Sequence, residues 1–343
     1  MITYNHEKYI SKALDSILMQ KTNFSYEIVI GEDCSTDKTR DILINYKKQY
    51  PDRFKLLLNE KNLGAYKNAH QALQACKGEY IAFLEGDDYW INPDKLQIQI
   101  EYMDAHPEVG LVHSDADMFN VKTGKLLHNA HKELGRTHDD NDENIYLRIL
   151  EDRYHIITCT VCVRRDLLFQ IINSNPYEFT SGAFLMGDTQ TWLELARVSK
   201  IKFFPESLSL YNLLPESASR SADLRKYIRF IKSGQDLRVH YLEKYGVPAH
   251  FSHMSLTAIN RDLLKMAYDA GDSDLAIDTM HIMRKYGHDI SFKCIAWYLG
   301  AQYPFLRIVF SPLIYLFRYL RKFKRFFINV KSRKSDEVVS MLR

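Results

Sequence analysis

Three carboxylate side chains follow an apolar segment in the first third of the chain. Residues 80–84 have the composition of a buried strand, and Glu85, Asp87 and Asp88 fall within the next four positions. Ligands of open α/β folds bind at the carboxyl ends of the strands, so these acids are expected at a binding edge. Adjacent hard oxygen ligands suit Mg²⁺ or Mn²⁺, which usually serve phosphate-bearing substrates. The alternative is an acidic strand-to-turn junction with no role in binding.

Two other predicted strands also end in polar residues. Residues 1–3 resemble the end of a strand, which closes with Thr3 and is followed by Tyr4. A second strand, over residues 26–31, is followed two residues later by Asp33. A buried Asp can accept a hydrogen bond from the imide N–H of a base, and a Tyr can stack on the face of that base. An unmatched buried polar group costs roughly 1–3 kcal/mol, so such pairing discriminates well. The sequence therefore predicts a nucleotide pocket that includes the acids after residue 84.

The elements that would position these residues alternate along the chain. Predicted strands cover residues 1–3, 26–31, 54–58, 80–84, 109–113, 156–163, 201–204 and 208–211. Predicted helices cover residues 7–20, 66–76, 93–105, 166–173 and 188–198, with one more between residues 37 and 46, and the pattern is nearly all helical from residue 222. This order predicts an α/β fold, with a mostly parallel sheet and helices on both faces. The polar residues 120–145 are predicted to form a mobile loop.

The composition is that of a soluble globular protein. The chain has 343 residues, 46% of them hydrophobic and 26% charged, enough for one large domain or one domain with an accessory region. Five scattered cysteines and the lack of a signal peptide predict a reducing compartment. Cys159 and Cys162 have the spacing of a redox or zinc motif. They lie in a predicted buried strand without a second cysteine pair nearby, so we interpret them as structural.

A further acid stands at a predicted helix start. Residues 184–195 combine an apolar lead, Gly187 and then Asp188. From physical chemistry alone, Asp188 is predicted to be the N-cap of the helix, a position that Asp fills very often.

Five pieces of the sequence together resemble the family 2 glycosyltransferases, which have the GT-A fold. In order they are Thr3-Tyr4-Asn5 with the helix that follows, Glu32-Asp33-Cys34-Ser35-Thr36-Asp37, Asn62-Leu63-Gly64, Lys77-Gly78-Glu79-Tyr80-Ile81 and Gly86-Asp87-Asp88. Each piece alone is weak, but their order and spacing match the family over roughly residues 1–215. The resemblance implies that the chain binds a nucleotide-diphosphate sugar, most simply a UDP-sugar.

The resemblance also implies roles for single residues. Asp33 corresponds to the acid that binds the base, and Tyr4, next to Thr3, to the residue that stacks on it. Asp87 corresponds to the ribose contact and Asp88 to the ligand of Mn²⁺ or Mg²⁺. Lys67 or Asn68 could face the donor, although Lys67 is equally compatible with a solvated surface position. The sequence has no Gly-rich phosphate cradle, so the metal is expected to neutralise the diphosphate.

In inverting members of the family, an Asp at a similar Gly-Asp helix start is the general base. By this resemblance Asp188 would take a proton from the acceptor hydroxyl as that oxygen attacks the anomeric carbon, an assistance of about 10²–10⁴-fold. The acceptor would be a glycan or lipid-linked saccharide of the cell surface. Trp192, one turn later, would either stack on a sugar or pack in the core.

Two departures from the family pattern concern the ends of this domain. Residues 1–3 supply only part of the first strand, so either the native start lies upstream or the strand is short. Residues 211–214 lack the His often found near the metal or the diphosphate, and residues 217–220 could partly replace it.

The C-terminal end is basic. No acid lies between Asp289 and Asp336, a stretch that holds ten Lys or Arg residues. Residues 305–330 mix these cations with apolar side chains, but the uninterrupted apolar run, residues 308–317, is shorter than the ~20 residues that span a membrane. We interpret the segment as an interfacial helix on an anionic leaflet, with a docked C-terminal helix as the alternative. No module for nucleic acid accompanies the charge.

These observations predict a domain organisation and a place in the cell. A GT-A domain is expected over residues 1–220, with a donor half over about residues 1–118 and an acceptor half over about residues 119–220. Residues 221–343 would form a helical region, and the protein would be cytoplasmic and peripheral on the inner face of the plasma membrane. One rival function is a sugar-1-phosphate nucleotidyltransferase, which would need a Gly-rich phosphate loop after the first strand. Another is a non-catalytic nucleotide-sugar sensor or membrane scaffold.

Overall fold

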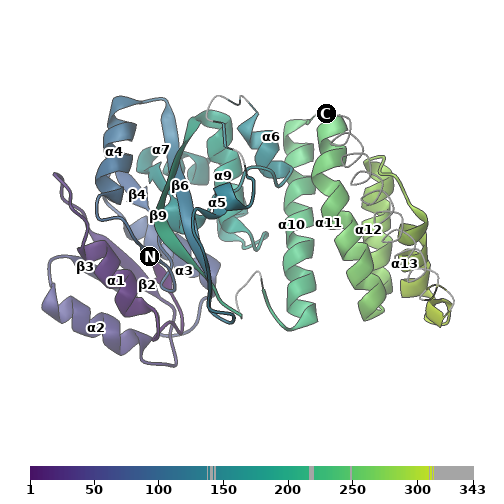
Figure 1. The fold of residues 1–343 in the computed structure, drawn as a ribbon, viewed down its shortest axis with the longest axis horizontal. Helices are drawn as coiled ribbons and strands as arrows, with labels where there is room; N and C mark the ends of the chain where they lie inside the picture. The colour runs from purple at the N-terminus through teal and green to yellow at the C-terminus, as the bar shows by residue number, and fades with distance from the viewer. Residues whose placement is uncertain are drawn as a thin grey trace, which may run out of the picture. The chain divides into compact units, whose positions relative to one another are not determined.

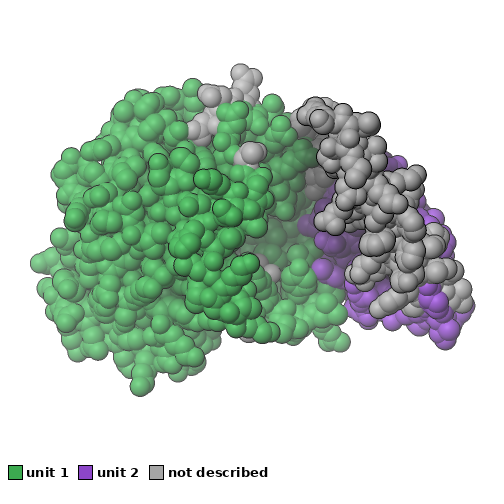
Figure 2. All heavy atoms as spheres, in the orientation of Figure 1, with its two compact units in different colours: residues 1–246 green, residues 247–343 purple. Residues whose placement is uncertain are grey.

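The chain divides into two compact units. The computed structural model describes residues 1–136, 138, 139, 142, 144–215, 220–247, 249–308, 310 and 312. One unit comprises residues 1–246 and the other residues 247–343 (Figure 2). The first unit is built of strands and helices, and the second of helices (Figure 1). Helix α10 (Leu224–Tyr245) is grouped with the first unit, beyond the boundary that the sequence predicts near residue 220.

The first sheet is parallel, as predicted. Its order is β1-β2-β3, with β1 at Ile2–Thr3, β2 at Ile28–Glu32 and β3 at Phe54–Leu58. The connections are helices α1 (Ile10–Leu18) and α2 (Thr39–Gln49), and α3 (Ala65–Ala75) follows β3. Parallel strands need such crossovers, because the chain must return to the same end of the sheet. The carboxyl ends of all three strands therefore lie at one edge.

The second sheet is mixed, so the prediction of a mostly parallel sheet is wrong for this half. Its order is β4-β8-β6-β9-β5, with β7 paired to β6. The bounds are β4 Tyr80–Ala82, β5 Tyr89–Trp90, β6 Val109–Asn120, β7 Lys125–Leu127, β8 Cys162–Arg164 and β9 Lys200–Leu213. Only β6 and β9 pair in parallel, and they lie side by side at the centre of this sheet (Figure 1). The other pairs are antiparallel.

An isolated bridge joins the two sheets where strands β1 and β4 end. Ile2 of β1 forms an isolated parallel bridge with Glu85, three residues after β4. The Gly86 N–H donates to the Ile2 carbonyl at 3.0 Å. The ends of β1, at Thr3, and β4, at Ala82, are thereby brought together, although they lie far apart in the sequence.

Several predicted boundaries shift because strands find partners that the sequence does not show. The polar residues after 113 continue strand β6 against β9, and part of the predicted mobile loop forms β7 and helix α5 (Ala130–Glu133). The predicted strands over 201–204 and 208–211 merge into β9 for the same reason. The predicted strand over 156–163 is a short 3₁₀ turn, η1 (Thr158–Thr160), followed by β8.

Further helices of the first unit are α4 (Lys95–Ala105), α6 (Ile145–Leu150), α7 (Arg165–Ser174), α8 (Pro176–Thr180) and α9 (Gly187–Val198). Helices α4, α7 and α9 pack against strands of the second sheet, and α6 and α8 pack against other helices. The core beside the first sheet takes one face of α1, where Ile10, Ala13, Leu14 and Ile17 are buried at helical spacing. Trp90 of β5 belongs to the same cluster. This burial fixes the sheet edge that carries the polar strand ends.

The second unit is described from helix α11 (Ala249–Ala270) through α12 (Ser273–Lys285) and α13 (Phe292–Gln302). Asp272 caps α12 by accepting from the Leu275 N–H at 2.9 Å. Among the described residues, no helix combines the length and the apolar character needed to cross a bilayer. Most of the predicted interfacial helix, including residues 313–330, lies outside the described part of the chain.

The contact of Gly31 in β2 with Asn68 in α3 leads to a testable prediction. A Cβ on Gly31 would lie 2.3 Å from Asn68 Oδ1, and Asn68 Nδ2 donates to the Gly31 carbonyl at 2.8 Å. Gly31→Ala is therefore expected to lower the free energy of unfolding by about 1–3 kcal/mol through overpacking. Asn68→Ala removes both the hydrogen bond and the obstructing amide. In that background Gly31→Ala should cost distinctly less, as urea denaturation of the four proteins would measure. Additive effects would contradict this account of the contact.

Candidate active site

Thr3 lies between the end of β2 and the acidic turn, residues 85–88. Both segments belong to the nucleotide pocket that the sequence predicts. The Thr3 carbonyl accepts from the Asp33 N–H at 3.1 Å, which ties the end of β1 to the end of β2. On its other side lies Gly86, where a Cβ would come within 2.5 Å of Thr3 Oγ1 and 2.8 Å of His6 Nδ1. Only glycine fits at residue 86 without displacing these groups. The acidic turn and the β1 end are thus in contact, as the sequence predicts.

Asp88 is buried, at 2% exposure, and is held by strand β9. The Asn212 N–H donates to its Oδ1 at 2.8 Å, and Asn212 Nδ2 donates to the Asp87 carbonyl at 2.5 Å. The Cys159 thiol lies near this carboxyl, since burial and then the charge of Asp88 raise the pKa of the thiol. Burial raises the pKa of Asp88 well above its usual range, and the charges of Asp87 and Glu85 raise it further.

Glu85 shows that the acids share one electrostatic environment. Burial raises the pKa of Glu85 to about 8, and the negative charges of Asp87 and then Asp188 add to the effect. Its Oε2 is buried and has no hydrogen-bond partner among the described residues. Asp188 comes from a segment about 100 residues later, so the fold brings it within electrostatic reach of the acidic turn.

Asp188 is exposed at the start of α9, but it is not the N-cap. Met186 holds that position and Gly187 is the first helical residue, so the predicted N-cap is wrong by two residues. Asp188 accepts from the Thr189 N–H at 2.7 Å on Oδ1 and from the Thr158 hydroxyl at 3.1 Å on Oδ2. An acid in the first turn still interacts favourably with the helix dipole.

Two other elements hold the segment before Asp188. The Tyr66 ring of α3 lies so close to Gly187 that a Cβ there would approach Tyr66 Cε2 to 2.9 Å. The Tyr66 hydroxyl donates to the Glu178 carbonyl of α8 at 3.1 Å. From α10, the Ser233 hydroxyl accepts from the Leu185 N–H at 2.7 Å. The carboxylate of Asp188 is therefore presented from a fixed backbone.

Asp33 is buried where the sequence predicts the base pocket, at 2% exposure. Its Oδ1 accepts from Leu63 N at 2.8 Å and from Asn59 Nδ2 at 3.1 Å, and its Oδ2 accepts from Gly64 N at 2.9 Å. Asp33 thus pins the turn at residues 62–64. A carboxylate has about four acceptor positions, so these three bonds leave about one for a ligand. Asn68, the alternative to Lys67, is buried in the same network and bonds Asn59 and Gly31.

Tyr4 and Lys67 are exposed. Tyr4 has 42% exposure and begins a loop whose next residues are bound to the loop after β2. There the backbone N–H groups of Asn5, His6 and Glu7 donate to the side chains of Ser35, Thr39 and Asp37, at 3.0, 2.8 and 3.0 Å. Lys67 lies on the first turn of α3. Within the described residues, no hydrogen bond or ion pair links Tyr4 or Lys67 to the acidic turn.

The region that lacks the expected His carries a Tyr–Arg pair instead. Burial raises the pKa of Tyr211 to about 12, while Arg220, hydrogen-bonded to the phenol, opposes the shift and Asp88 reinforces it. The Arg220 guanidinium lies 5.9 Å from the centre of the Tyr211 ring. Of the predicted substitutes, residues 217–219 lie outside the described part, and Arg220 is exposed.

Cys159 and Trp192 pack in the interior. Cys159 and Cys162 are free thiols that are completely buried, as expected for structural cysteines. Trp192 is 2% exposed and meets Phe83 edge to face at 5.5 Å, so core packing accounts for it and sugar stacking does not. The sequence did not single out Thr158, because its contact with Asp188 spans 30 residues and no local pattern marks it.

The acidic turn fits a divalent cation by its chemistry. Its donors are hard carboxylate oxygens, one of them without a partner, and their charges repel one another. The described residues contain no group of three or more His, Cys, Asp or Glu arranged as a ready cage. Mg²⁺-type sites commonly use one or two carboxylates and complete the shell with water and substrate phosphates. Asp88 with Asp87 or Glu85 meets that requirement.

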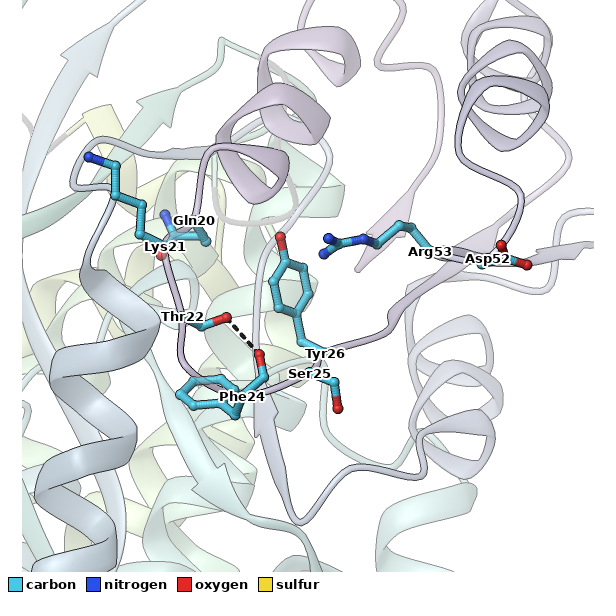
Figure 3. Close-up of a pocket in the computed structure, with 8 residues that line it drawn as sticks. All are labelled: Gln20, Lys21, Thr22, Phe24, Ser25, Tyr26, Asp52 and Arg53. Carbon is cyan, nitrogen blue, oxygen red and sulfur yellow. Dashed lines mark hydrogen bonds between the residues drawn. The ribbon is translucent and has the colours of Figure 1, made fainter.

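A hollow of about 500 Å³ lies elsewhere. It is lined by Gln20, Lys21, Thr22, Phe24, Ser25, Tyr26, Asp52 and Arg53 (Figure 3). The Arg53 guanidinium lies 5.0 Å from the Tyr26 ring centre. These residues precede strands β2 and β3, whereas the predicted site follows the strands, so the hollow lies at the opposite edge of the sheet.

Comparison with known proteins agrees with this geometry. Residues 1–169 match the family model described as glycosyl transferase family 2. The uncharacterised protein Rv1520 of Mycobacterium tuberculosis is 46% identical over 107 residues, 31% of each chain. The putative teichuronic acid biosynthesis glycosyltransferase TuaG of Bacillus subtilis is 42% identical over 101 residues, 29% of this chain and 39% of TuaG. The matched part spans about a third of the length of these relatives.

Solved structures share the fold over most of the chain. TarS 1–349 of S. aureus in complex with UDP has a TM-score of 0.54 at 19% identity, with 88% of each chain covered. The mannosyltransferase PcManGT of Pyrobaculum calidifontis, in complex with GDP-Man and Mn²⁺, has a TM-score of 0.51 at 18% identity, covering 90% of this chain and 84% of that one. The resemblance to family 2 glycosyltransferases that the sequence motifs indicate is confirmed over residues 1–169, and the GT-A fold is confirmed over most of the chain.

Proposed function

We propose that the protein is an inverting glycosyltransferase that moves a sugar from a nucleotide-diphosphate donor to a hydroxyl of a glycan or lipid-linked saccharide. The observation that carries this proposal is the meeting of Asp188 with the acidic turn, because the charge of Asp188 reaches Glu85 across the site. One acid group can serve the donor while the other faces the acceptor. The names of TuaG and TarS support cell-wall polysaccharide synthesis as the setting.

The donor is proposed to be a UDP-sugar. Asp33 retains about one acceptor position, which suits the imide N–H of uracil, and the exposed Tyr4 ring offers a stacking surface. The side chains of Thr3 and Asp87 meet beside His6, whose Nδ1 lies 3.2 Å from Thr3 Oγ1 and 3.9 Å from Asp87 Oδ1. The TarS complex with UDP supports this choice of nucleotide.

The diphosphate would be neutralised by Mn²⁺ or Mg²⁺ at Asp88 and by Arg220. A bound divalent ion stabilises the charge that develops on the leaving nucleoside diphosphate. The exposed cation of Arg220 lies beside Tyr211, a residue that the charge of Asp88 reaches, and would contact the same oxygens. Lys67 remains a candidate donor contact from α3. The Mn²⁺ in the PcManGT complex supports a metal for this chain as well.

Asp188 would act as the general base. Its Oδ1 accepts from the N–H and the hydroxyl of Thr189, whereas its Oδ2 accepts from the Thr158 hydroxyl and keeps a lone pair for a substrate. Oδ2 would take the proton of the acceptor hydroxyl while the hydroxyl oxygen attacks the anomeric carbon. The C–O bond to the diphosphate breaks in the same displacement, and the anomeric configuration inverts.

A nucleotidyltransferase is the less favoured alternative. Such an enzyme needs free backbone N–H groups after the first strand to cradle phosphates. Here the N–H groups of Asn5, His6 and Glu7 are already bound to side chains of the next loop. A non-catalytic sensor would not require Asp188 to face the acidic turn.

The first prediction concerns the base. Asp188→Asn keeps the size of the side chain and one oxygen that can accept the bond from Thr158 or from Thr189, so binding of UDP with Mn²⁺ should be unchanged in a thermal-shift titration. Release of UDP from a panel of UDP-sugars, with water as the acceptor, should fall by about 10²–10⁴-fold. Asp166→Asn is the matched control, because Asp166 is also the second residue of its helix, α7. Turnover near that of the wild type would remove Asp188 from the role.

The second prediction concerns the acidic turn without metal. The pKa of Glu85 rises from about 4.5 in the unfolded chain to about 8 in the fold. Its contribution to stability is therefore full below pH 4.5 and is lost as the pH rises through 8. Glu85→Gln, which is always neutral, should stabilise the metal-free protein at about pH 8 and have little effect at about pH 4.5.

Urea denaturation in EDTA at several pH values would measure this difference. Glu60→Gln, at an exposed position, serves as the control. A stability difference that does not change with pH would contradict the burial of Glu85 among like charges.

The third prediction concerns the membrane. We propose that the protein is cytoplasmic and binds the inner membrane face through its C-terminal region, where Phe305 and Ile308 are 67% and 80% exposed. Phe305→Ser with Ile308→Ser should weaken sedimentation with phosphatidylglycerol vesicles by about tenfold, because apolar insertion is lost. Leu224→Ser, an exposed leucine of the first unit, is the control. Equal binding of both variants would argue against insertion of this segment.

A further inference from the structure

The 3₁₀ turn η1 touches both of the acids to which the proposed function gives separate roles. The Thr158 hydroxyl donates to Asp188 Oδ2 at 3.1 Å. The next residue, Cys159, is completely buried and has its thiol near the Asp88 carboxyl. Adjacent residues of one turn therefore reach the proposed base on one side and the proposed metal ligand on the other.

The turn is anchored against movement. The Cys159 carbonyl accepts from Trp90 Nε1 at 3.0 Å and from Ser209 Oγ at 2.9 Å. The Thr160 carbonyl accepts from Gln99 Nε2 at 2.8 Å. Cys159 and Thr160 are completely buried. Strands β5 and β9 and helix α4 thus fix the position of η1.

The contacts leave both acids able to react. Asp188 accepts from Thr158 on Oδ2 and from Thr189 on Oδ1, which fixes the plane of the carboxylate. Asp88 accepts from the Asn212 N–H, and the buried Cys159 thiol lies near it. Orientation of a reacting group by such contacts can be worth a large part of its rate effect, since misplacement by about 1 Å can cost 10²-fold.

We propose that η1 is a positioning element, in which Thr158 orients the general base Asp188 and Cys159 orients the metal-binding acid Asp88. The turn would fix the spacing between the donor side and the acceptor side of the reaction. This inference rests on the proposed function for the roles of the two acids, but the contacts themselves do not depend on it.

Substitutions of Thr158 distinguish a positioning role of its hydroxyl from a purely structural role. Thr158→Val removes the hydroxyl and keeps the branched shape, whereas Thr158→Ser keeps the hydroxyl. In the full chain with Mn²⁺ and the UDP-sugar that the wild type turns over, Thr158→Val should lower kcat about tenfold with KM within about twofold. The acidic limb of its pH–rate profile should move to higher pH, because a donor to the ionised carboxylate is lost. Thr158→Ser should restore both.

Substitutions of Cys159 are tested by ligand binding, which does not require an assay of turnover. Cys159→Ala should weaken the binding of UDP with Mn²⁺ several-fold in a calorimetric titration, and Cys159→Ser should bind more tightly than Cys159→Ala. Cys162→Ala, another completely buried thiol, controls for the loss of packing.

The outcomes of the two arms are distinguishable. Wild-type kcat and pH profile in Thr158→Val, or a loss of thermal stability alone, would overturn the positioning role of Thr158. Unchanged UDP–Mn²⁺ binding in Cys159→Ala would overturn that of Cys159. If the wild type turns over no nucleotide sugar, the proposed function fails, and the Cys159 arm still decides whether η1 supports a nucleotide site.

Discussion

The structure depends on carboxylates that are held close together where water cannot fully screen them. Glu85 and Asp88 are pushed toward their neutral forms by burial and then by the charge of Asp87, and Asp188 adds to the repulsion at Glu85. Such an arrangement is unfavourable in isolation, so the rest of the fold must hold it. A divalent cation with a diphosphate would relieve the repulsion, which gives the site a physical reason to bind a nucleotide sugar.

The fold supplies this restraint through contacts between distant segments. Gly86 admits the end of β1, Asn212 of β9 holds Asp88, and Gly187 lets α9 begin against Tyr66 of α3. At the two glycines a side chain would meet neighbouring atoms within 3 Å. The same constraint explains why the donor acids and the proposed base need not be near each other in sequence. Their spacing is set by strand pairing and by the turn η1.

Local patterns predicted the elements whose partners are neighbours in the chain. Strand β3 begins and ends where its apolar run does, at Phe54–Leu58, and the acids after β4 were found from their types and spacing alone. The length of β6 and the single strand β9 could not be predicted, because they depend on each other. The directions of the strands in the second sheet were predicted wrongly for the same reason, because they too depend on which strands pair. Thr158 escaped notice because its partner is fixed only by tertiary structure.

The most direct test of the central claim is a crystal structure of the chain with UDP and Mn²⁺, using anomalous scattering to locate the metal. The account predicts Mn²⁺ in contact with Asp88 and the diphosphate, uracil beside Asp33, and the Asp188 carboxylate facing the open end of the diphosphate. Manganese bound away from Asp88, or Asp188 turned toward another cavity, would contradict it.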